Sequence, residues 1–395
     1  MKAVVFEKFQ TFPSLTDIEK PTPGPGEVLL KVAGSGACHS DVALYKEFAE
    51  GDPGASAPPF VLGHEISGWI EEVGPSVDGF TKGDAYLVYG PIGCGHCKAC
   101  SRGQDTYCEN QASMPYLASG IGKNGGMAEY VVVPARNLVP LGDADPIEAA
   151  PLSDAGLTPY HAIKLSLPNL AGGGKYALVI GLGGLGLVAV QILKALTGAT
   201  IIATDMKEDA MKAAEELGAF TVPGGADQVE RIREIAGGRG ADAVFDFVGA
   251  TPTISTAHAS VAVQGRITIV GIAGGTLEGW NFFTNPYEAT ITNTYWRGDL
   301  SRGFRPPPRG KGFRHNDTLC CSTARLRHIL SHVAIALHGG SARALSRRGA
   351  TESRTPWRLG VCMGPQPGAG GAAASSRRNG ELPAPSRNSE WNSGR

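Results

Sequence analysis

The chain contains the stretch Tyr176-Ala177-Leu178-Val179-Ile180-Gly181-Leu182-Gly183-Gly184-Leu185-Gly186, which decides the fold of its second half. The five residues that open it form a continuous apolar run, which is typical of a parallel strand buried on both faces. Glycines follow at the spacing G-x-G-x-x-G, and residues 187–196 then indicate a helix. Strand, glycine turn and helix in this order predict a dinucleotide-binding βαβ unit.

The glycines of this turn are cofactor-binding candidates with separate roles. Gly181 permits the tight turn, and Gly183 lets the backbone approach a pyrophosphate at the positive helix N-terminus. Gly186 allows close packing of the helix on the strand, and Gly184 completes the turn. The alternative interpretation is a glycine-rich loop in an unrelated α/β domain.

Asp205 ends the next predicted strand, residues 200–204, and lies 24 positions after Gly181. Its carboxylate can accept hydrogen bonds from a ribose 2′-hydroxyl, whereas its charge would repel a 2′-phosphate. The sequence therefore favours NAD over NADP. The alternation then continues, with predicted helices at 208–217 and 228–236 and predicted strands at 243–249 and 266–271 that end in glycine. This pattern predicts a doubly wound parallel sheet, in which strand ends line a ligand crevice.

The first half of the chain is different, because it holds many short β segments separated by turns. The clearest are residues 1–6, 27–32, 66–74 and 82–89. They predict a compact, mostly β domain.

Four cysteines of this first half, Cys94, Cys97, Cys100 and Cys108, fall within 15 positions of a chain that has eight. Two-residue gaps let a tight turn present several thiolates to one tetrahedral ion, so the cluster predicts a closed structural zinc site. His96 is expected to be a bystander, because four sulfurs complete the shell. Two disulfides are the alternative, which a reducing compartment disfavours.

A second set of metal donors begins with Cys38-His39-Ser40-Asp41 and ends with Gly63-His64-Glu65. Thiolate, imidazole and carboxylate are the donor types that bind Zn²⁺. Singly, each residue is ambiguous, since a lone cysteine is commonly a small buried hydrophobe.

Composition places the chain among soluble globular proteins, with 395 residues, 42% hydrophobic and 18% charged. This length allows two or more domains. No run is long and apolar enough to span a bilayer, and the N-terminus lacks the pattern of a signal peptide. We therefore expect a cytoplasmic protein whose thiols stay reduced.

Together these motifs resemble the zinc-dependent medium-chain alcohol dehydrogenases, and most closely the bacterial NAD-dependent secondary-alcohol type. The resemblance rests on residues 63–77, which contain Gly63-His64-Glu65-Ile66-Ser67-Gly68, on the four-cysteine cluster and on the motif at 181–186. It covers residues 1–296. It implies a GroES-like, mostly β catalytic domain at 1–155, a Rossmann NAD-binding domain at 156–296, and one catalytic and one structural zinc ion.

The resemblance also implies roles for single residues. Cys38, His64 and Asp154 would ligate the catalytic zinc, although Asp154 could otherwise be a helix cap. Glu65 is a nearby carboxylate that can approach the metal. Asp41 would orient His64. Ser40 would pass the alcohol proton outward. On the cofactor side, His39 would face the pyrophosphate and Thr158 would contact nicotinamide, while Trp296 would line the substrate pocket unless it is ordinary core. The aromatic residues expected around an apolar pocket also include Tyr45, Phe48, Phe282 and Phe283.

The implied function is hydride transfer from a primary or secondary alcohol to NAD, giving an aldehyde or ketone. The implied partners are a small alcohol or ketone and further copies of the chain in a homodimer or homotetramer, with no membrane and no nucleic acid. One alternative is a catalytically inert protein that binds zinc and nucleotide. Another is a zinc-free quinone or enoyl reductase, a class that lacks the counterparts of Cys38, His64 and the four cysteines.

The resemblance stops after Trp296, where the composition changes. Residues 1–296 hold 19 basic and 32 acidic residues, whereas 297–395 hold 17 basic, 16 of them arginine, and only 5 acidic. Three interpretations compete for this tail. It is an out-of-frame translation, a basic extension that binds nucleic acid or acidic surfaces, or a disordered linker with no role. We favour the first, because the break is abrupt.

Overall fold

The computed structural model describes residues 1–52, 55–279, 281–294 and 296. The predictions for the tail at 297–395 fall outside these residues. No helix in the described part of the chain is long and apolar enough to cross a membrane.

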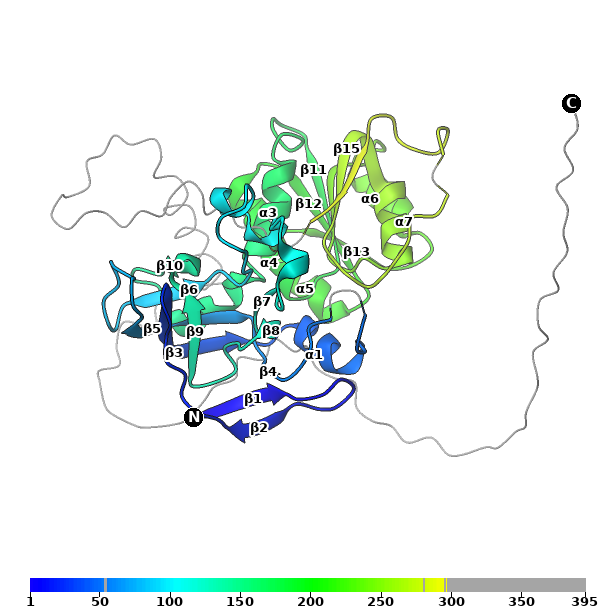
Figure 1. The fold of residues 1–395 in the computed structure, drawn as a ribbon. Helices are drawn as coiled ribbons and strands as arrows, with labels where there is room; N and C mark the ends of the chain where they lie inside the picture. The colour runs from blue at the N-terminus through cyan, green and yellow to red at the C-terminus, as the bar shows by residue number, and fades with distance from the viewer. Residues whose placement is uncertain (53–54, 280, 295, 297–395) are drawn as a thin grey trace, which may run out of the picture. The chain divides into compact units, whose positions relative to one another are not determined.

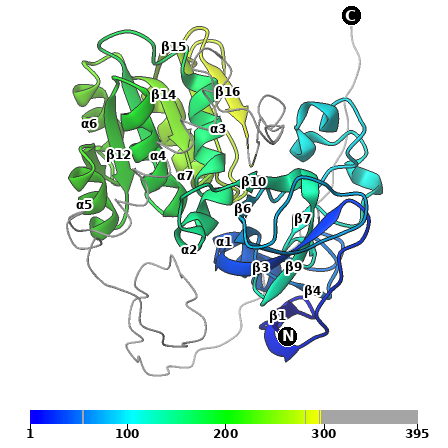
Figure 2. The ribbon, with the colours of Figure 1, turned by 90° about the vertical axis from the view of Figure 1, so that its left-hand side faces the viewer.

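The first half of the chain is mostly β, as predicted, and its strands form mainly antiparallel sheets (Figure 1 and Figure 2). A three-stranded sheet has the order β2-β1-β4, a five-stranded sheet has the order β10-β6-β5-β3-β9, and β7 pairs with β8. The strands are β1 (Lys2–Phe6), β2 (Ser14–Asp17), β3 (Glu27–Gly36), β4 (Phe60–Val61), β5 (Glu65–Val73), β6 (Ala85–Val88), β7 (Ala118–Ser119), β8 (Gly122–Lys123), β9 (Tyr130–Pro134) and β10 (Leu138–Pro140).

Short helices connect these strands. The α-helices are α1 (His39–Lys46) and α2 (Pro146–Ala149), and the 3-10 helices are η1 (Cys100–Arg102), η2 (Asp105–Tyr107), η3 (Gln111–Ser113), η4 (Ala135–Asn137) and η5 (Ala150–Ser153). The pairing of β3 with β5 is the longest in this half and runs from Val28 opposite Val73 to Gly36 opposite Glu65. Alternating residues such as Val28, Leu30 and Ile70 are buried in one core cluster. This pairing fixes the start of β5, directly after His64.

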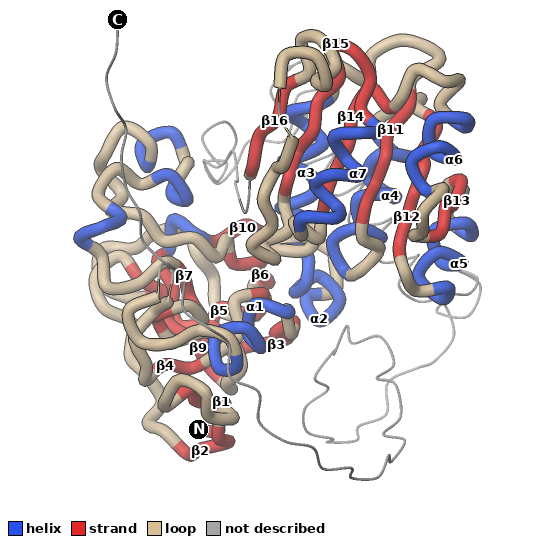
Figure 3. The backbone as a smooth tube through the Cα atoms, turned by 90° about the vertical axis from the view of Figure 1, so that its right-hand side faces the viewer, coloured by secondary structure: helices blue, strands red, loops and turns tan. Residues whose placement is uncertain are grey.

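The second half contains a six-stranded sheet in which every neighbouring pair is parallel, in the order β13-β12-β11-β14-β15-β16 (Figure 3). The strand order reverses between β11 and β14, and ligands bind at such a reversal in doubly wound sheets. The elements are α3 (Leu157–Ser166), β11 (Tyr176–Ile180), α4 (Gly184–Leu196), β12 (Thr200–Asp205), α5 (Glu208–Glu216), β13 (Phe220–Pro223), α6 (Gln228–Ile235), β14 (Ala241–Asp246), α7 (Thr251–Ser260), β15 (Val261–Ile269) and β16 (Thr290–Asn293).

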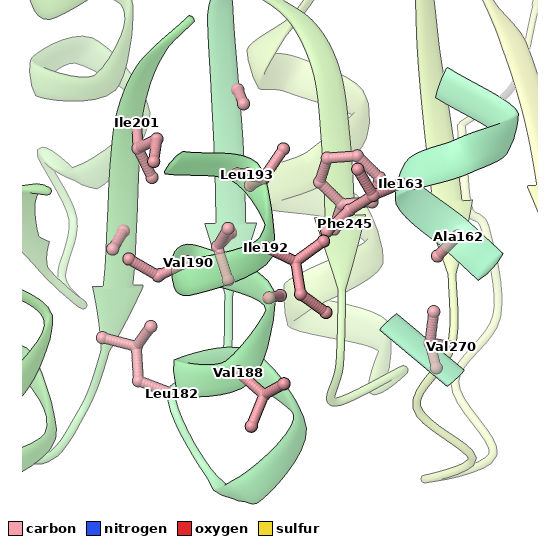
Figure 4. Packing of buried hydrophobic residues seen from close by; sticks show 14 of the residues in the cluster. Ala162, Ile163, Leu182, Val188, Val190, Ile192, Leu193, Ile201, Phe245 and Val270 are labelled. Carbon is pink, nitrogen blue, oxygen red and sulfur yellow. The ribbon is translucent and has the colours of Figure 1, made fainter. Parts of the chain in front are cut away.

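Alternation along the strands divides the core of this sheet into two clusters. Val179, Ala203 and Phe245 pack on one face with residues of α3, α4 and α5, among them Val190 and Ile192 (Figure 4). Neighbouring strand residues point to the opposite face, where they pack with α6 and α7. Because both faces are covered by helices, the central strand β11 is apolar along its length, as the run at 176–180 predicted.

Several predicted boundaries are wrong. The strands predicted at 243–249 and 266–271 end earlier, at Asp246 and Ile269. The first of these strands ends early because the side chain of Asp246 accepts hydrogen bonds from the backbone N–H groups of Val248 and Gly249. These bonds turn the chain out of the sheet. Helix α4 begins at Gly184, inside the glycine motif, rather than at 187.

Candidate active site

Cys38, His64 and Asp154 come together although they lie far apart in the sequence. Cys38 precedes α1, His64 precedes β5, and Asp154 follows η5. Asp154 Oδ2 lies 3.7 Å from Cys38 Sγ and 3.6 Å from His64 Nε2. Ligand atoms around tetrahedral zinc are separated by about 3.5 Å, given metal–ligand bonds of about 2.0–2.3 Å. The spacing and the donor types therefore fit Zn²⁺ held by these three side chains.

Asp41 supports two of these donors at once. Its Oδ1 lies 3.2 Å from Nδ1 of His64 and accepts the N–H of Gly63, and its Oδ2 accepts the N–H of Cys38 at 2.9 Å. The contact through Nδ1 directs Nε2 of His64 toward Asp154 and Cys38. Burial lowers the pKa of His64, but Asp41 and Asp154 beside the ring outweigh burial and raise that pKa well above its usual range.

The other residues of the 38–41 segment lie at the start of α1. Ser40 places its Oγ 3.2 Å from His64 Nε2, within hydrogen-bond distance of the candidate ligand atom. His39 is the first residue of the helix, and its side chain is exposed.

Glu65 is buried directly after His64. Burial, with a contribution from the charge of Asp154, raises the pKa of Glu65 to about 8. Gly36 lies opposite Glu65 in the β3–β5 pair, and a Cβ at this position would overlap the Glu65 carboxylate. Sequence reasoning missed Gly36. The predicted strand ended at residue 32, whereas β3 continues to Gly36, and a glycine inside a strand commonly marks a close approach by another group.

Thr158 orients Asp154, because its Oγ1 donates to Asp154 Oδ1 at 2.7 Å. The side chain of Asp154 is therefore not a helix cap, since α3 follows Gly156 without a side-chain cap. The backbone N–H of Trp296 donates to the same Thr158 hydroxyl, at 3.3 Å from Oγ1.

Trp296 is buried and lies edge-on to His64, with ring centroids 5.2 Å apart. Its indole N–H donates to the carbonyl of Ser153 at 2.9 Å, and its own carbonyl accepts from Thr106 Oγ1 at 2.7 Å. The ring also fills the space that a side chain at Gly90 would need. Trp296 thus forms a wall beside His64, and it is also part of the buried core.

Within the residues that the structure describes, the aromatic side chains expected around an apolar pocket do not all gather at the donor group. Phe282 and Phe283 are 73% and 89% exposed and contact each other, so the prediction is wrong for both. Tyr45 and Phe48 pack instead against the core cluster that contains Phe6. A single sequence does not show which aromatic residues the fold turns inward.

Cys94, Cys97, Cys100 and Cys108 converge as a second group of metal donors. Sγ of Cys94 lies 4.0 Å from that of Cys100, and the same distance separates Cys97 and Cys108. Backbone N–H groups point at the sulfurs, as from Cys97 to Cys94 at 3.4 Å. The N–H of His96, the largest cause, helps to lower the pKa of Cys94 to about 6, which favours the thiolate that zinc requires. Four sulfurs at this spacing fit a closed tetrahedral site.

Two further residues complete the surroundings of the four cysteines. His96 lies outside the donor group, with its Nδ1 2.8 Å from the carbonyl of Cys94. Arg136 donates to the carbonyl of Cys100 at 2.9 Å and to Asp105 at 3.2 Å. The five cysteines in the described ranges are free thiols.

The glycine turn has the geometry that a dinucleotide needs. Gly181 has a φ of +85°, which favours glycine, and a Cβ at Gly186 would overlap the carbonyl oxygen of Gly181. Positions 183 and 184 are open, with no atom within 4 Å of an added Cβ. Asp205 lies beside the turn, where its Oδ2 accepts the N–H of Leu182 at 2.7 Å.

Comparison with known proteins agrees with this chemistry. The family model "Alcohol dehydrogenase GroES-like domain" matches residues 24–143, and the model "Zinc-binding dehydrogenase" matches residues 184–305. The NAD-dependent alcohol dehydrogenase of Sulfolobus acidocaldarius is 41% identical over 281 residues, which are 70% of this chain and 79% of that protein. The D-arabinose 1-dehydrogenase (NADP⁺) of Saccharolobus solfataricus is 36% identical over 279 residues, covering 69% of this chain and 77% of that protein.

Solved structures give the same result. The alcohol dehydrogenase of Aeropyrum pernix has a TM-score of 0.69 and 34% identity, and the match covers 76% of this chain and 87% of that one. The fold and donor groups define a metal-dependent oxidoreductase with a Rossmann domain. The chain belongs to the zinc-dependent medium-chain alcohol dehydrogenases. The family models and relatives support Zn²⁺ and NAD as its cofactors.

Proposed function

We propose that this chain oxidises a primary or secondary alcohol reversibly to an aldehyde or ketone, with NAD as the hydride acceptor, at the group formed by Cys38, His64 and Asp154. The observation that carries the proposal is the convergence of these three donors beside the buried ring of Trp296. A closed four-ligand site could not accept a substrate, whereas three protein ligands leave room for one.

Zinc bound there supplies a Lewis acid that lowers the pKa of an alcohol. Residues of the chain orient the metal ligands and carry the proton away. Asp41 fixes the orientation of His64, and Thr158 fixes that of Asp154. Ser40, whose Oγ is within reach of the ligand atom Nε2, takes the alcohol proton and passes it outward. The wall formed by Trp296 limits the size of the alcohol on one side.

Glu65 and His39 have supporting parts in this proposal. Glu65 is a buried carboxylate next to His64 that can approach the metal. His39 is exposed at the start of α1, where it can meet the cofactor pyrophosphate. Thr158, which is bonded to Asp154, is assigned the contact with nicotinamide in this proposal because the family resemblance implies it.

The glycines at 181, 183, 184 and 186 and the carboxylate of Asp205 hold the cofactor. Open space at positions 183 and 184 leaves the backbone free to meet a pyrophosphate. The proposed preference for NAD over NADP rests on the carboxylate of Asp205. It needs a direct test, because one relative carries NADP⁺ in its name. Kinetics with both cofactors measure this preference directly, and we expect a higher kcat/KM with NAD.

The domain limits are part of the same proposal, with a catalytic domain at 1–155 and an NAD-binding domain at 156–296. We also propose that 297–395 is translated out of frame, which the abrupt change from lysine and acid to arginine supports. A family-like C-terminal sequence in another frame of the coding DNA is the expected finding. Its absence would favour a basic extension or a linker.

We further propose a cytoplasmic homodimer or homotetramer that binds neither membrane nor nucleic acid. A reducing compartment suits both donor groups, because thiolates must be free to bind metal. Light scattering coupled to gel filtration gives the oligomeric state.

The test of the function is zinc content together with NADH formation by the full-length protein. We expect two zinc ions per chain and turnover of 2-propanol and primary alcohols, with their ratio giving the preference. Zinc bound without turnover of any alcohol would show a catalytically inert protein that binds metal and nucleotide.

A further inference from the structure

Asp246 is a fully buried carboxylate at the carboxyl end of β14 that the proposed chemistry does not use. Its Oδ1 accepts the N–H groups of Val248 and Gly249, each at 2.9 Å, and its Oδ2 accepts the hydroxyl of Thr253 at 2.9 Å. A buried charge is costly unless hydrogen bonds compensate it. Three donors satisfy this one, and they are all contributed by the residues that immediately follow the strand.

These bonds give the turn at 247–250 its shape. Thr253 Oγ1, which donates to Asp246, also accepts the N–H of Ala250 at 3.0 Å. Three successive backbone N–H groups are therefore held, two directly by the carboxylate and one through the hydroxyl. Helix α7 begins directly after this turn.

The turn held by Asp246 contacts the dinucleotide motif. The N–H of Phe247 donates to the carbonyl of Ile180 at 2.9 Å, at the end of β11. Val248 Cγ2 lies 2.6 Å from the position that a Cβ at Gly181 would occupy. Any movement of the turn therefore moves the side chain of Val248, which packs against Gly181, the first glycine of the motif.

The same residue also reaches the loop after β15. The backbone carbonyl of Asp246 accepts the N–H groups of Val270 at 2.8 Å and Gly271 at 3.0 Å, and the carbonyl of Gly249 accepts the N–H of Gly275 at 2.9 Å. Gly249, Gly271 and Gly275 line a hollow of ≈ 460 Å³. Their backbones approach one another too closely for side chains. The loops after β11, β14 and β15 thus form one packed unit at the carboxyl edge of the sheet.

We propose that Asp246 is a positioning residue for NAD, which acts by holding these three loops in the conformation that binds the cofactor. The inference rests on the proposed function, since it assumes that the crevice at this edge binds NAD. Loops fixed before binding lose little conformational freedom when the ligand arrives, so their fixation raises affinity. Loss of the carboxylate leaves buried N–H groups unpaired, and the turn then adopts other conformations.

Asp242 provides a matched control at the other end of the same strand, four residues or about 13 Å away. It is also a buried carboxylate, and it is bound by Lys175 at 2.9 Å, Arg239 at 3.0 Å and the N–H of Tyr176 at 2.9 Å. Its partners stabilise the amino edge of the sheet. Its removal lowers stability without touching the loops after β11, β14 and β15.

The experiment compares Asp246→Ala and Asp242→Ala in the full-length protein, at a temperature where circular dichroism shows both to be folded. NADH affinity is measured by fluorescence titration, and KM is measured separately for NAD and for 2-propanol. We expect Asp246→Ala to weaken NADH binding roughly 10- to 30-fold, because the loops must then be ordered when the cofactor binds. KM for NAD rises with it, whereas KM for 2-propanol changes by less than about twofold. Asp242→Ala lowers Tm but leaves NADH affinity within about twofold.

A second pair of variants covers the case in which Asp246→Ala does not fold. Thr253→Val keeps the shape of the side chain but removes the hydroxyl, and we expect NADH binding to weaken about 3- to 10-fold. Thr253→Ser restores the hydroxyl and the affinity. Equal NADH affinity in Thr253→Val and wild type, or equal loss in Asp242→Ala and Asp246→Ala, would overturn the inference while the proposed function stands. Failure of the wild-type protein to bind NADH would overturn both this inference and the proposed function.

Discussion

The two groups of candidate zinc ligands are built in opposite ways. Cys94, Cys97, Cys100 and Cys108 are four like donors from a single short segment. The other group joins a thiolate, an imidazole and a carboxylate at positions 38, 64 and 154, which precede α1, precede β5 and follow η5. The first group needs only local turns, whereas the second needs the β3–β5 pairing and the chain that follows β10. The proposed roles in stability and in catalysis thus belong to sites of different architecture.

The groups that support the two sites also differ, although one side chain, Asn110, donates to Cys94 Sγ at 3.3 Å. Backbone N–H groups point at the sulfurs of the four-cysteine site, as from Cys100 to Cys97 at 3.4 Å. At the other site side chains orient the ligands, with Asp41 beside His64 and Thr158 bonded to Asp154. Side chains can be replaced singly, so this difference can be tested.

The largest expected effect is the loss of turnover in Cys38→Ser. The hydroxyl is a poor zinc ligand, and metal activation of the substrate is worth several kcal/mol, so kcat should fall about 10³-fold or more. Zinc content should drop from two to one per chain, while NADH binding and Tm stay close to wild type. Full activity in this variant would contradict the assignment of the three-donor site to catalysis.

Cys108→Ser should affect stability instead. Loss of the closed site removes metal-binding energy from the folded state, and a loss of about 3 kcal/mol corresponds to a drop in Tm of roughly 10 °C. Below the new Tm, kcat per folded chain should remain within about threefold of wild type. If kcat fell as far as in Cys38→Ser with unchanged Tm, the two sites would not have separate roles.

Thr158→Val tests the side-chain support of the three-donor site. The variant keeps the volume but removes the 2.7 Å bond to Asp154. We expect kcat to fall about 10-fold, as is usual when a group that orients a metal ligand is lost. Thr158→Ser should recover most of the activity. A large fall in Tm without a fall in kcat would instead indicate a packing role.

The smallest effect concerns acid stability, and it shows whether metal loss alone explains unfolding at low pH. Burial would raise the pKa of Asp242, but Lys175, the Tyr176 N–H and Arg239 outweigh it and lower the pKa. The unfolded chain has a pKa of about 3.9 here, so the carboxylate stabilises the fold above that pH. The contribution is lost as pH falls through the lower folded value.

Asp242→Asn should therefore cost about 1–2 kcal/mol near pH 7, and the difference from wild type should shrink below about pH 4. Urea unfolding at a series of pH values measures this. A constant difference at all pH values would show that the ionised carboxylate is not the stabilising group.

The sequence predicted most of the fold because its signals are local. The run at 176–180 and the glycines after it identified β11, the turn and α4 without any tertiary information. The same locality applies to Cys94–Cys108, because two-residue gaps already bring the sulfurs together. Boundaries failed where a side chain competes with the sheet, as Asp246 does by taking the N–H groups after β14.

By itself, therefore, the sequence determined the two halves, the nucleotide turn and the four-cysteine group, since each depends on residues a few positions apart. The family resemblance supplied Cys38, His64 and Asp154 as a set, and the tertiary structure decided that they meet. Only the fold also placed Trp296 against His64, left Phe282 and Phe283 exposed, and made room for Glu65 at Gly36. The physical reason is that these contacts join distant segments, and their geometry follows from strand register and helix packing rather than from spacing along the chain.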